Sequence, residues 1–352
     1  MNALNTALQQ QTQDTEISLS LPYQLKAQLP LSSALKQQVA QHRQIIQNIL
    51  AGTDPRLLVI AGPCSIHDPQ AALEYAEKLK QLQSQVSDQI FLVMRAYIEK
   101  PRTTIGWKGF LYDPNLDGSA NMQLGLEKSR ELYLQIIEMG LPIASEILSP
   151  MATGYFDDVL AWGAIGARTS ESQIHREISS AMPYSIGFKN GTDGSIQIAL
   201  DAIQSASHPH QFMGMSQSGL PAILSSQGNP HAHLILRGAN SGPNYHLAEI
   251  EKIQQKAKGQ LPALIIDCSH GNSHKDPQQQ PQVLRTIVAE REQTQVRGIM
   301  LESHLVDGNQ KISCDMTYGQ SVTDGCLGWD KTEQLLIEVA ESLNRQILAK
   351  TA

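Results

Sequence analysis

Short runs of apolar residues recur along most of the chain, and segments with the spacing of amphipathic helices separate them. These runs are apolar at successive positions rather than at alternate ones, which is typical of strands buried on both faces of a parallel sheet. We interpret eight runs as strands: Leu57–Ala61, Phe91–Arg95, Ile143–Glu146, Gly163–Ala167, Tyr184–Lys189, His233–Arg237, Leu264–Asp267 and Gly298–Glu302. Eight buried strands alternating with helices over about 290 residues predict an α/β fold, the (β/α)8 or TIM barrel.

A doubly wound sheet is the alternative architecture, but the glycine-rich nucleotide loop of such folds is missing after the first strand. One segment breaks the alternation of strands and helices. Phe212–Met215 and Ala222–Ser225, on either side of Ser218-Gly219, predict an inserted β-hairpin over about residues 211–226, before the sixth strand.

The first 56 residues differ from the rest because they are polar and rich in glutamine. An amphipathic run from Ser33 to Leu50, followed by Gly52, predicts one helix that ends at this glycine. We therefore divide the chain into an N-terminal arm and helix over residues 1–56 and a barrel over residues 57–352. Composition alone leaves open that this helix merely covers a core.

Composition narrows the class of protein. Hydrophobic residues make up 41% of the 352 residues, enough for a sizeable core, and the formal net charge is −7. The absence of a basic block argues against nucleic acid as a partner. No run of about 18 apolar residues is present, so no membrane helix is expected. The polar N-terminus shows no secretory signal, and we expect a cytoplasmic protein with unpaired cysteines.

Residues that can bind a metal follow three of the predicted strands. Cys64 follows the first strand, His270 follows the seventh, Glu302 ends the eighth, and Asp324 comes shortly afterwards. Strands seven, eight and one are neighbours in a closed barrel, so these side chains can meet at one wall of its carboxyl end. A single buried cysteine usually only packs, but a thiolate, an imidazole and two carboxylates together suit a divalent transition-metal ion.

Basic residues follow four other predicted strands: Arg95, Lys100, Arg102, Arg168, Lys189 and Arg237. Six cations at one barrel mouth, in a protein of net negative charge, predict a site for a small polyanion such as a phosphorylated substrate. Phosphate-binding residues that face a metal indicate condensation or cleavage of phosphorylated carbonyl compounds. Lys189 could instead form a Schiff base, although the following Asn190-Gly191-Thr192 looks more like a phosphate loop.

Several joined motifs occur in a fixed order: Gly62-Pro63-Cys64-Ser65, Lys100-Pro101-Arg102-Thr103-Thr104, Gly166-Ala167-Arg168-Thr169, Gly187-Phe188-Lys189-Asn190-Gly191-Thr192, Ile235-Leu236-Arg237-Gly238, Asp267-Cys268-Ser269-His270 and Glu302-Ser303-His304. With them the chain resembles 3-deoxy-D-arabino-heptulosonate 7-phosphate (DAHP) synthases of the class I, short microbial type. The resemblance implies a transferase of the shikimate pathway that condenses phosphoenolpyruvate, D-erythrose 4-phosphate and water to DAHP and phosphate.

The resemblance also implies a role for each site residue. The metal ligands would be Cys64, His270, Glu302 and Asp324. The phosphoenolpyruvate contacts would be Arg95, Lys100, Arg168, Lys189 and Arg237. Arg102 and Thr103 would bind erythrose 4-phosphate. Catalysis would involve Lys100, Cys64 and His270, with either Lys100 or metal-bound water as the general acid. The ion could be Mn²⁺, Fe²⁺, Co²⁺ or Zn²⁺.

Control by an aromatic amino acid is a further implication, because relatives place the inhibitor between the arm, the hairpin and the strand before Lys189. Gly214 resembles the tyrosine-sensitive isozymes, since a glycine there leaves room for a phenol hydroxyl. Met182 and Pro183 stand where relatives differ, and Pro183 and Tyr184 could block the pocket. We expect inhibition by tyrosine rather than phenylalanine, in a homodimer or homotetramer.

Two other functions remain as alternatives. The related synthase that uses arabinose 5-phosphate is disfavoured by Arg102-Thr103-Thr104, a pairing which that family typically lacks. A phosphosugar-binding regulator without catalysis is disfavoured because a binder has no need for four metal-binding residues.

Overall fold

The computed structural model describes residues 16–257 and 262–351. Eight parallel strands close into a barrel in the order β1-β10-β9-β8-β5-β4-β3-β2. Their bounds are β1 (Leu57–Gly62), β2 (Ile90–Arg95), β3 (Ile143–Glu146), β4 (Trp162–Ile165), β5 (Ser185–Lys189), β8 (His233–Leu236), β9 (Leu264–Asp267) and β10 (Gly298–Glu302). The predicted barrel is therefore confirmed, and β9, β10 and β1 are consecutive neighbours in it as expected.

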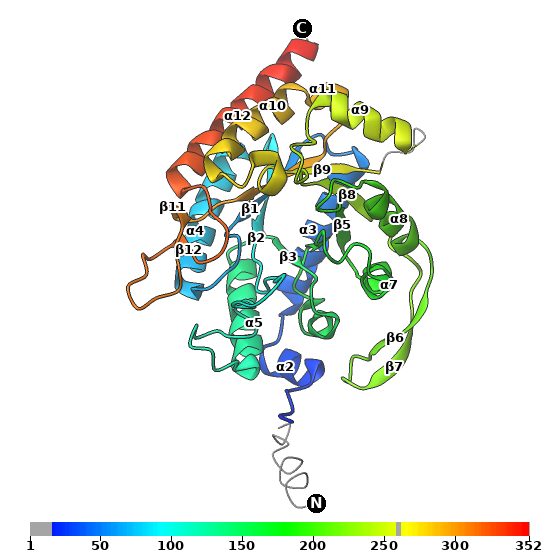
Figure 1. Cartoon of the computed structure of the whole chain (residues 1–352), viewed down its shortest axis with the longest axis vertical. Helices are drawn as coiled ribbons and strands as arrows, with labels where there is room; N and C mark the ends of the chain where they lie inside the picture. Colours follow the sequence, from blue (N-terminus) through cyan, green and yellow to red (C-terminus); the bar gives the residue numbers. More distant parts are fainter. Residues whose placement is uncertain (1–15, 258–261, 352) are drawn as a thin grey trace, which may run out of the picture.

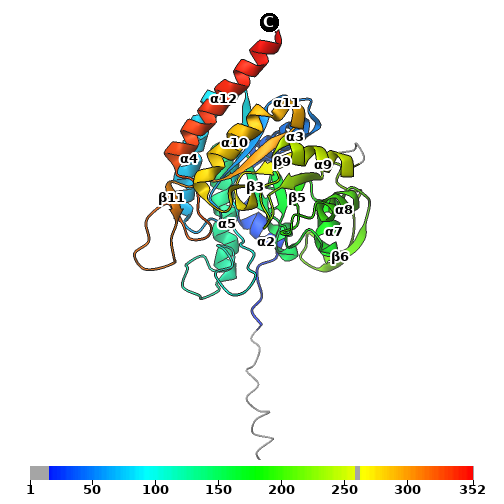
Figure 2. The same ribbon diagram turned by 45° about the horizontal axis from the view of Figure 1, so that its top comes forward.

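Helices surround the strands (Figure 1). They are α4 (Pro69–Val86), α5 (Met122–Glu138), α6 (Thr153–Phe156), α7 (Gln173–Ala181), α8 (Gln197–Ala206), α9 (Leu247–Lys256), α10 (Gln280–Ala289), α11 (Arg291–Thr294) and α12 (Trp329–Thr351), with short 3-10 turns η1 (Pro150–Ala152), η2 (His270–Ser273) and η3 (Pro277–Gln279). Asp68 caps α4 by accepting hydrogen bonds from the backbone N–H groups of Gln70 and Ala71. The long α12 projects beyond the barrel at the C-terminus (Figure 2).

The residues of each strand alternate between two cores. Leu57 and Val59 of β1 pack outward toward the helices, whereas Leu58 and Ile60 belong to a second cluster inside the barrel. Trp162, the largest fully buried side chain, also lies in this inner cluster. Both faces of every barrel strand are thus buried, which explains why the strands read as continuous apolar runs.

The helix α3 (Ser33–Ala51) closes the amino-terminal end of the barrel. Its residues Ile46, Ile49 and Leu50 belong to the same inner cluster as the strand residues, and α3 runs behind the strands in Figure 1. The helix ends at Gly52, which adopts a left-handed conformation with φ of 79°. α3 therefore shares a core with the barrel, and the arm that precedes it is a separate feature.

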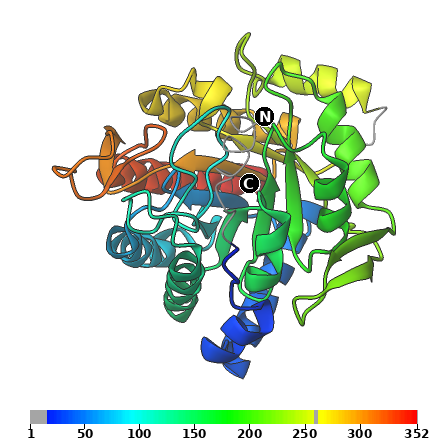
Figure 3. The ribbon, with the colours of Figure 1, turned by 60° about the horizontal axis from the view of Figure 1, so that its bottom comes forward.

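The arm and the inserted hairpin meet at α6. The hairpin consists of β6 (Gln211–Met215) and β7 (Pro221–Ser225), paired antiparallel, and α2 (Pro22–Gln28) follows the arm. In Figure 3 the hairpin (yellow-green) stands apart from the barrel beside the amino-terminal helices (blue). Lys26 of α2 forms an ion pair with Asp157, and the amide of Gln217 donates to the same carboxylate over 3.3 Å.

A buried arginine fixes the arm to the barrel. Arg130 on α5 is fully buried and donates to the backbone oxygens of Leu29 and Tyr155, at 2.8 and 2.9 Å, and to the Asp158 carboxylate. The hairpin matches its prediction within one residue at each strand. A further two-stranded sheet of β11 (Val306–Asn309) and β12 (Gln320–Ser321) had no apolar run to predict it.

Within residues 16–257 and 262–351, no helix combines the length and apolar content needed to cross a membrane.

Candidate active site

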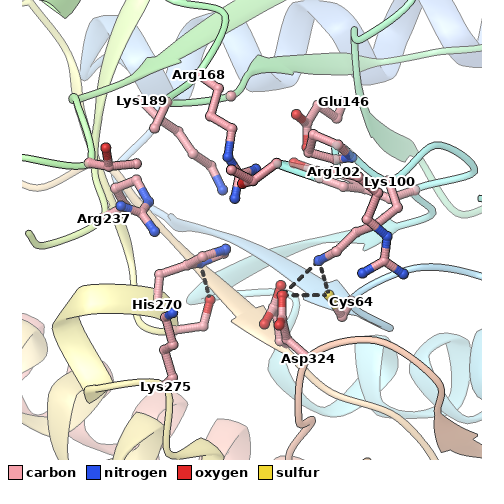
Figure 4. Close-up of a pocket in the computed structure, with 18 of the residues that line it drawn as sticks. Cys64, Lys100, Arg102, Glu146, Arg168, Lys189, Arg237, His270, Lys275 and Asp324 are labelled. Atoms are coloured by element: carbon pink, nitrogen blue, oxygen red, sulfur yellow. Dashed lines mark hydrogen bonds and ion pairs between the residues drawn. The ribbon is translucent and has the colours of Figure 1, made fainter. Parts of the chain in front are cut away.

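A cavity of about 590 Å³ opens at the carboxyl ends of the barrel strands (Figure 4). It is lined by every residue that the sequence predicted for metal or substrate binding: Cys64, Arg95, Lys100, Arg102, Thr103, Arg168, Lys189, Arg237, His270, Glu302 and Asp324. The strands position these side chains because each residue stands at the end of a strand or in the loop that follows it. The cavity therefore has the location of a TIM-barrel active site.

Three of the four predicted metal ligands form a cluster. The donor atoms of Cys64, Glu302 and Asp324 all lie within 4.8 Å of one another. Cys64 and Glu302 are buried and Asp324 is exposed, so the cluster lies at the boundary between the barrel and the cavity. One sulfur and two carboxylate oxygens are donors that suit a divalent transition-metal ion.

His270 lines the same cavity but stands outside this cluster. Its Nδ1 lies 3.0 Å from Asp267 Oδ2 and 2.7 Å from the Ser269 hydroxyl. Its Nε2 has no hydrogen-bond partner in the described part of the chain, so this is the nitrogen that could bind an ion. Such a carboxylate contact to the other ring nitrogen is the usual way in which proteins orient a metal-binding histidine.

Lys100 supplies a cation to the cluster. Its Nζ lies 3.0 Å from Cys64 Sγ and 2.6 Å from Asp324 Oδ2. Burial opposes the charge of this lysine, yet Cys64, Glu302 and Asp324 together raise its pKa above the ordinary value. Burial likewise opposes ionisation of Asp324, and the Lys100 ammonium nevertheless lowers its pKa. These donors therefore already stabilise one positive charge, as a site for a metal ion must do.

Arg95 holds Cys64 and Glu302 in place. Its guanidinium donates to the backbone oxygens of Pro63 and Cys64, at 3.0 and 2.9 Å, and to Glu302 Oε1 at 3.1 Å. The guanidinium also lies 3.6 Å from the centre of the Tyr97 ring, a cation–π contact. Arg95 is 3% exposed, so its position is determined before any substrate binds.

Asp267 connects the two walls of the cavity and was missed by the sequence analysis as a site residue. Its Oδ2 accepts from Lys189 Nζ at 2.8 Å and faces His270, while its Oδ1 accepts from the Ser269 hydroxyl at 2.6 Å. Although burial opposes ionisation, Lys189 and His270 hold the pKa of Asp267 well below its usual range. The only signal in the sequence was an acidic residue at the end of an apolar strand.

Two arginines on the opposite wall are available for an anion. Arg168 and Arg237 form no ion pair with the described residues, in contrast to Arg95, Lys100 and Lys189. Burial lowers the pKa of Arg237, and the like charge of Arg168 lowers it further. A bound phosphate or carboxylate would relieve the repulsion between these two neighbouring guanidiniums, which favours binding of such an anion here.

Three acidic or basic residues of the cavity lining were not predicted. Glu146 ends β3, and its buried Oε1 has no hydrogen-bond partner among the residues that the structure describes. Lys275 lies in the loop after β9 with a left-handed φ of 64°. Glu99 directly precedes Lys100 and is buried. Glu146 shares the strand-end position of Glu302 and was overlooked, whereas the positions of Glu99 and Lys275 depend on how their loops fold.

The proposed regulatory residues lie away from this cavity. A Cβ atom added to Gly214 would lie 2.7 Å from Leu224 Cδ1, so the Leu224 side chain already fills the space beside this glycine. Met182 directly follows α7 and accepts a hydrogen bond from the Tyr184 hydroxyl over 3.3 Å. A groove of about 430 Å³ lies nearby, between Leu21, Tyr23, Gln217, Ser218 and Leu220.

Comparisons with known proteins identify the family of the chain. The chain matches the DAHP synthetase I family over residues 31–337. The tyrosine-sensitive phospho-2-dehydro-3-deoxyheptonate aldolases of Salmonella typhimurium and Escherichia coli are each 48% identical over 341 residues, which cover 95% of this chain and 96% of each relative. The solved structure of a phospho-2-dehydro-3-deoxyheptonate aldolase from Francisella tularensis is 45% identical, with a TM-score of 0.91, and the match covers 94% of this chain and 98% of that one.

Proposed function

The chain belongs to the DAHP synthetase I family and is a 3-deoxy-7-phosphoheptulonate synthase, and on this premise we propose how the cavity divides its residues between two substrates and a metal ion. The enzyme condenses phosphoenolpyruvate with D-erythrose 4-phosphate and water, giving DAHP and phosphate in the first step of the shikimate pathway. A carbon–carbon bond forms between C3 of phosphoenolpyruvate and the aldehyde carbon, and water adds at C2 as phosphate leaves.

Phosphoenolpyruvate binds at the cationic wall in this proposal. The support is that Arg168 and Arg237 have no ion pair within residues 16–257 and 262–351 and lie beside Lys189, whose ammonium is fixed by Asp267 at 2.8 Å. Arg95 completes this wall and simultaneously holds the carbonyl of Cys64. Fixed guanidiniums and an ammonium bind a carboxylate and a phosphate without a large loss of side-chain entropy.

Erythrose 4-phosphate binds between the metal cluster and the loop that carries Arg102 and Thr103. Cys64, Glu302, Asp324 and the Nε2 atom of His270 would hold a divalent ion, whose chemistry is to polarise the aldehyde oxygen. Mn²⁺, Fe²⁺, Co²⁺ and Zn²⁺ all suit these donors. Lys100 holds a proton at Nζ beside this cluster, so it is our candidate for the general acid that protonates the new hydroxyl.

One observation carries the assignment of roles: arginines without an ion pair to the described residues and a cysteine–carboxylate cluster face each other across a single cavity. The test is a steady-state assay of phosphoenolpyruvate loss and phosphate release with each aldose phosphate, before and after treatment with a chelator. We expect turnover with erythrose 4-phosphate that chelation removes and divalent ions restore. Preference for arabinose 5-phosphate would favour the related synthase, and phosphosugar binding without turnover would favour a binding protein.

We also propose that tyrosine inhibits the enzyme and that the chain forms a homo-oligomer. Relatives that are 48% identical carry the name tyrosine-sensitive. An apolar surface on the hairpin supports self-association, since Met213 and Ile223 pair across β6 and β7 and are 85% and 81% exposed. Analytical ultracentrifugation of the wild type and of Met213→Lys would test whether this surface joins the subunits.

A further inference from the structure

The loop after β2 folds back on itself before it reaches the cavity. The backbone N–H of Lys100 donates to Lys108 O at 2.8 Å, and that of Leu111 donates to Ile98 O at 3.0 Å. Gly109, with φ of 111°, permits this approach, since a Cβ there would lie 2.4 Å from Ile98 O. Residues 100–104 therefore form part of a closed loop whose two ends lie together at residues 98–99 and 108–111.

Glu99 lies at the base of this loop and links it to a second loop. Its Oε1 accepts from the Tyr112 hydroxyl at 3.2 Å, and its Oε2 accepts from the backbone N–H of Ser149 at 3.3 Å. Tyr112 lies just beyond the returning segment, and Ser149 lies in the connection between β3 and η1. One carboxyl group, 4% exposed, thus joins three separate segments of the chain.

The position of this carboxyl group bears directly on the site. Glu99 directly precedes Lys100 in the chain, and the Lys100 ammonium contacts Cys64 and Asp324. The same loop carries Arg102 and Thr103. A loop tied at its base loses less conformational entropy when its tip binds a ligand. The phosphoenolpyruvate wall depends less on this tie, because Arg168, Lys189 and Arg237 follow other strands and only Lys100 of its expected contacts belongs to this loop.

We propose that Glu99 is a positioning residue for the aldose phosphate: its two hydrogen bonds fix the loop base so that Lys100 and Arg102 face the cavity. The inference rests on the proposed function, because it assumes that this loop binds erythrose 4-phosphate. Glu99 also lines the cavity, but in this proposal it acts through the loop that it fixes.

The environment of Glu99 gives the proposal a pH signature. The groups that face its carboxyl are the Tyr112 hydroxyl, the backbone N–H groups of Leu148 and Ser149, and the carboxyl of Glu146. Burial raises the pKa of Glu99 to about 7, and the like charge of Glu146 contributes in the same direction. The ionised form is the stronger acceptor for both hydrogen bonds, so the loop should be held less firmly as Glu99 becomes protonated below this pH.

The experiment measures both Michaelis constants in Glu99→Ala, Glu99→Gln and Tyr112→Phe, with Glu131→Ala on the exposed side of α5 as the control. We expect the KM for erythrose 4-phosphate to rise about tenfold in Glu99→Ala, while the KM for phosphoenolpyruvate changes less than about threefold. Tyr112→Phe keeps the Ser149 contact and should show a smaller shift in the same direction. Glu99→Gln keeps the shape but is neutral at every pH and has one acceptor oxygen, so its KM for erythrose 4-phosphate should lie between those of wild type and Glu99→Ala.

The pH dependence supplies a readout that a merely structural role would not change. In wild type, kcat/KM for erythrose 4-phosphate should fall as the pH decreases through about 7, because Glu99 becomes protonated. Glu99→Gln should lack this fall. Equal increases of both Michaelis constants, or wild-type constants in Glu99→Ala and Tyr112→Phe, would overturn the proposal. An unchanged pH profile in Glu99→Gln would overturn it too. If Glu99→Ala does not fold, the other two variants decide.

The two hypotheses fail in different ways. Absence of turnover in the wild-type enzyme with erythrose 4-phosphate would refute the proposed roles of the cavity residues. If the wild type is active and substitution of Glu99 leaves both Michaelis constants unchanged, only the positioning role would be refuted. Gel filtration and metal content of each variant, compared with wild type, ensure that neither assembly nor the metal site accounts for the difference.

Discussion

Lys100 Nζ lies 2.6 Å from Asp324 Oδ2, and both side chains belong to the wall where a metal ion is expected. The lysine side chain is 14% exposed and the aspartate side chain 55%, so the pair spans the boundary between protein and cavity. The same ammonium contacts Cys64 Sγ at 3.0 Å. A divalent ion held by these donors must therefore share them with Lys100, and this competition has consequences for affinity and turnover.

Replacing Lys100 with methionine should separate metal binding from catalysis. The substitution removes the competing charge, so we expect Mn²⁺ to bind about 10–100-fold more tightly while turnover is lost. Titration calorimetry of the two proteins measures the change. Lys275→Met is the matched control, since Lys275 lines the same cavity without an ion pair to the described residues. Weaker Mn²⁺ binding in Lys100→Met would contradict the competition.

Replacing Cys64 with serine should abolish turnover by weakening metal binding while the fold stays intact. A thiolate is the softest of the donors, and a hydroxyl in its place remains protonated and binds poorly. Metal content by mass spectrometry, circular dichroism and the phosphoenolpyruvate assay together test this. Cys314→Ser changes an exposed cysteine outside the cavity and should behave as wild type. Full activity with normal metal content in Cys64→Ser would refute the ligand assignment.

Arg237→Ala and Lys189→Ala should both weaken phosphoenolpyruvate binding, but only the second should also destabilise the protein. Each removes a charge-assisted contact worth about 1.5–3 kcal/mol, so the KM for phosphoenolpyruvate should rise about 10–150-fold and that for the aldose much less. Lys189→Ala also leaves Asp267, 1% exposed, without its ammonium partner, which typically costs about 3–5 kcal/mol. Denaturant unfolding and steady-state kinetics measure the two effects. Equal increases for both substrates would show that the wall is wrongly assigned.

His233 should make the fold sensitive to acid. Its Nε2 accepts a hydrogen bond from Trp162 Nε1 at 3.1 Å, and its Nδ1 donates to His231 O at 2.9 Å, so the folded ring is neutral. Burial lowers the pKa of His233 from 6.5 to about 4. Between these values the unfolded chain binds a proton that the folded chain excludes. Stability should therefore fall by about 3 kcal/mol as pH decreases from about 6.5 to about 4.

The glutamine variant His233→Gln tests this contribution. Its amide can accept from Trp162 and donate to His231 but does not titrate, so urea denaturation from pH 4.5 to 7.5 should show a shallower loss of stability. Burial lowers the pKa of His42 and His304 too, and these residues should preserve part of the slope. An unchanged slope in His233→Gln would exclude His233 as a source.

Tyrosine should inhibit at lower concentration than phenylalanine, and Gly214→Ser should reduce that difference. A side chain at Gly214 would meet Leu224 Cδ1 at 2.7 Å, so serine must displace Leu224 within the hairpin. Inhibition titrations with tyrosine, phenylalanine and tryptophan on both proteins measure the effect. Stronger inhibition by phenylalanine, or none by either amino acid, would contradict the regulatory proposal.

Strands were the most predictable part of the fold, because burial on both faces leaves a continuous apolar run. The predicted bounds of β3, β9 and β10 agree with the structure, and the other strands shift by one or two residues at their ends. The amphipathic pattern of α3 predicted that one face of the helix is buried. It did not predict what this face packs against, since any apolar surface could cover it. Only the closed barrel shows that this face covers the inner core.

The site was predictable where chemistry coincides with a strand end. Cys64, Lys189 and Glu302 stand out because a reactive or charged group follows an apolar run. Asp267 occupies the same kind of position, but its importance lies in contacts with Lys189 and His270, which only the assembled barrel brings together. Glu99 gave no signal, because its partners belong to loops whose conformation no local pattern determines.

The position of α3 has a consequence for synthesis on the ribosome. Its apolar face emerges early, yet the surface that covers it includes Ile235, Ile265 and Met300, which are translated much later. Until then Ile46, Ile49 and Leu50 have no complete partner surface and remain exposed to self-association or to chaperones. The nascent chain thus carries the helix that closes the barrel long before the last barrel strands are made. Closure of the barrel and docking of this helix must therefore be late and concerted events.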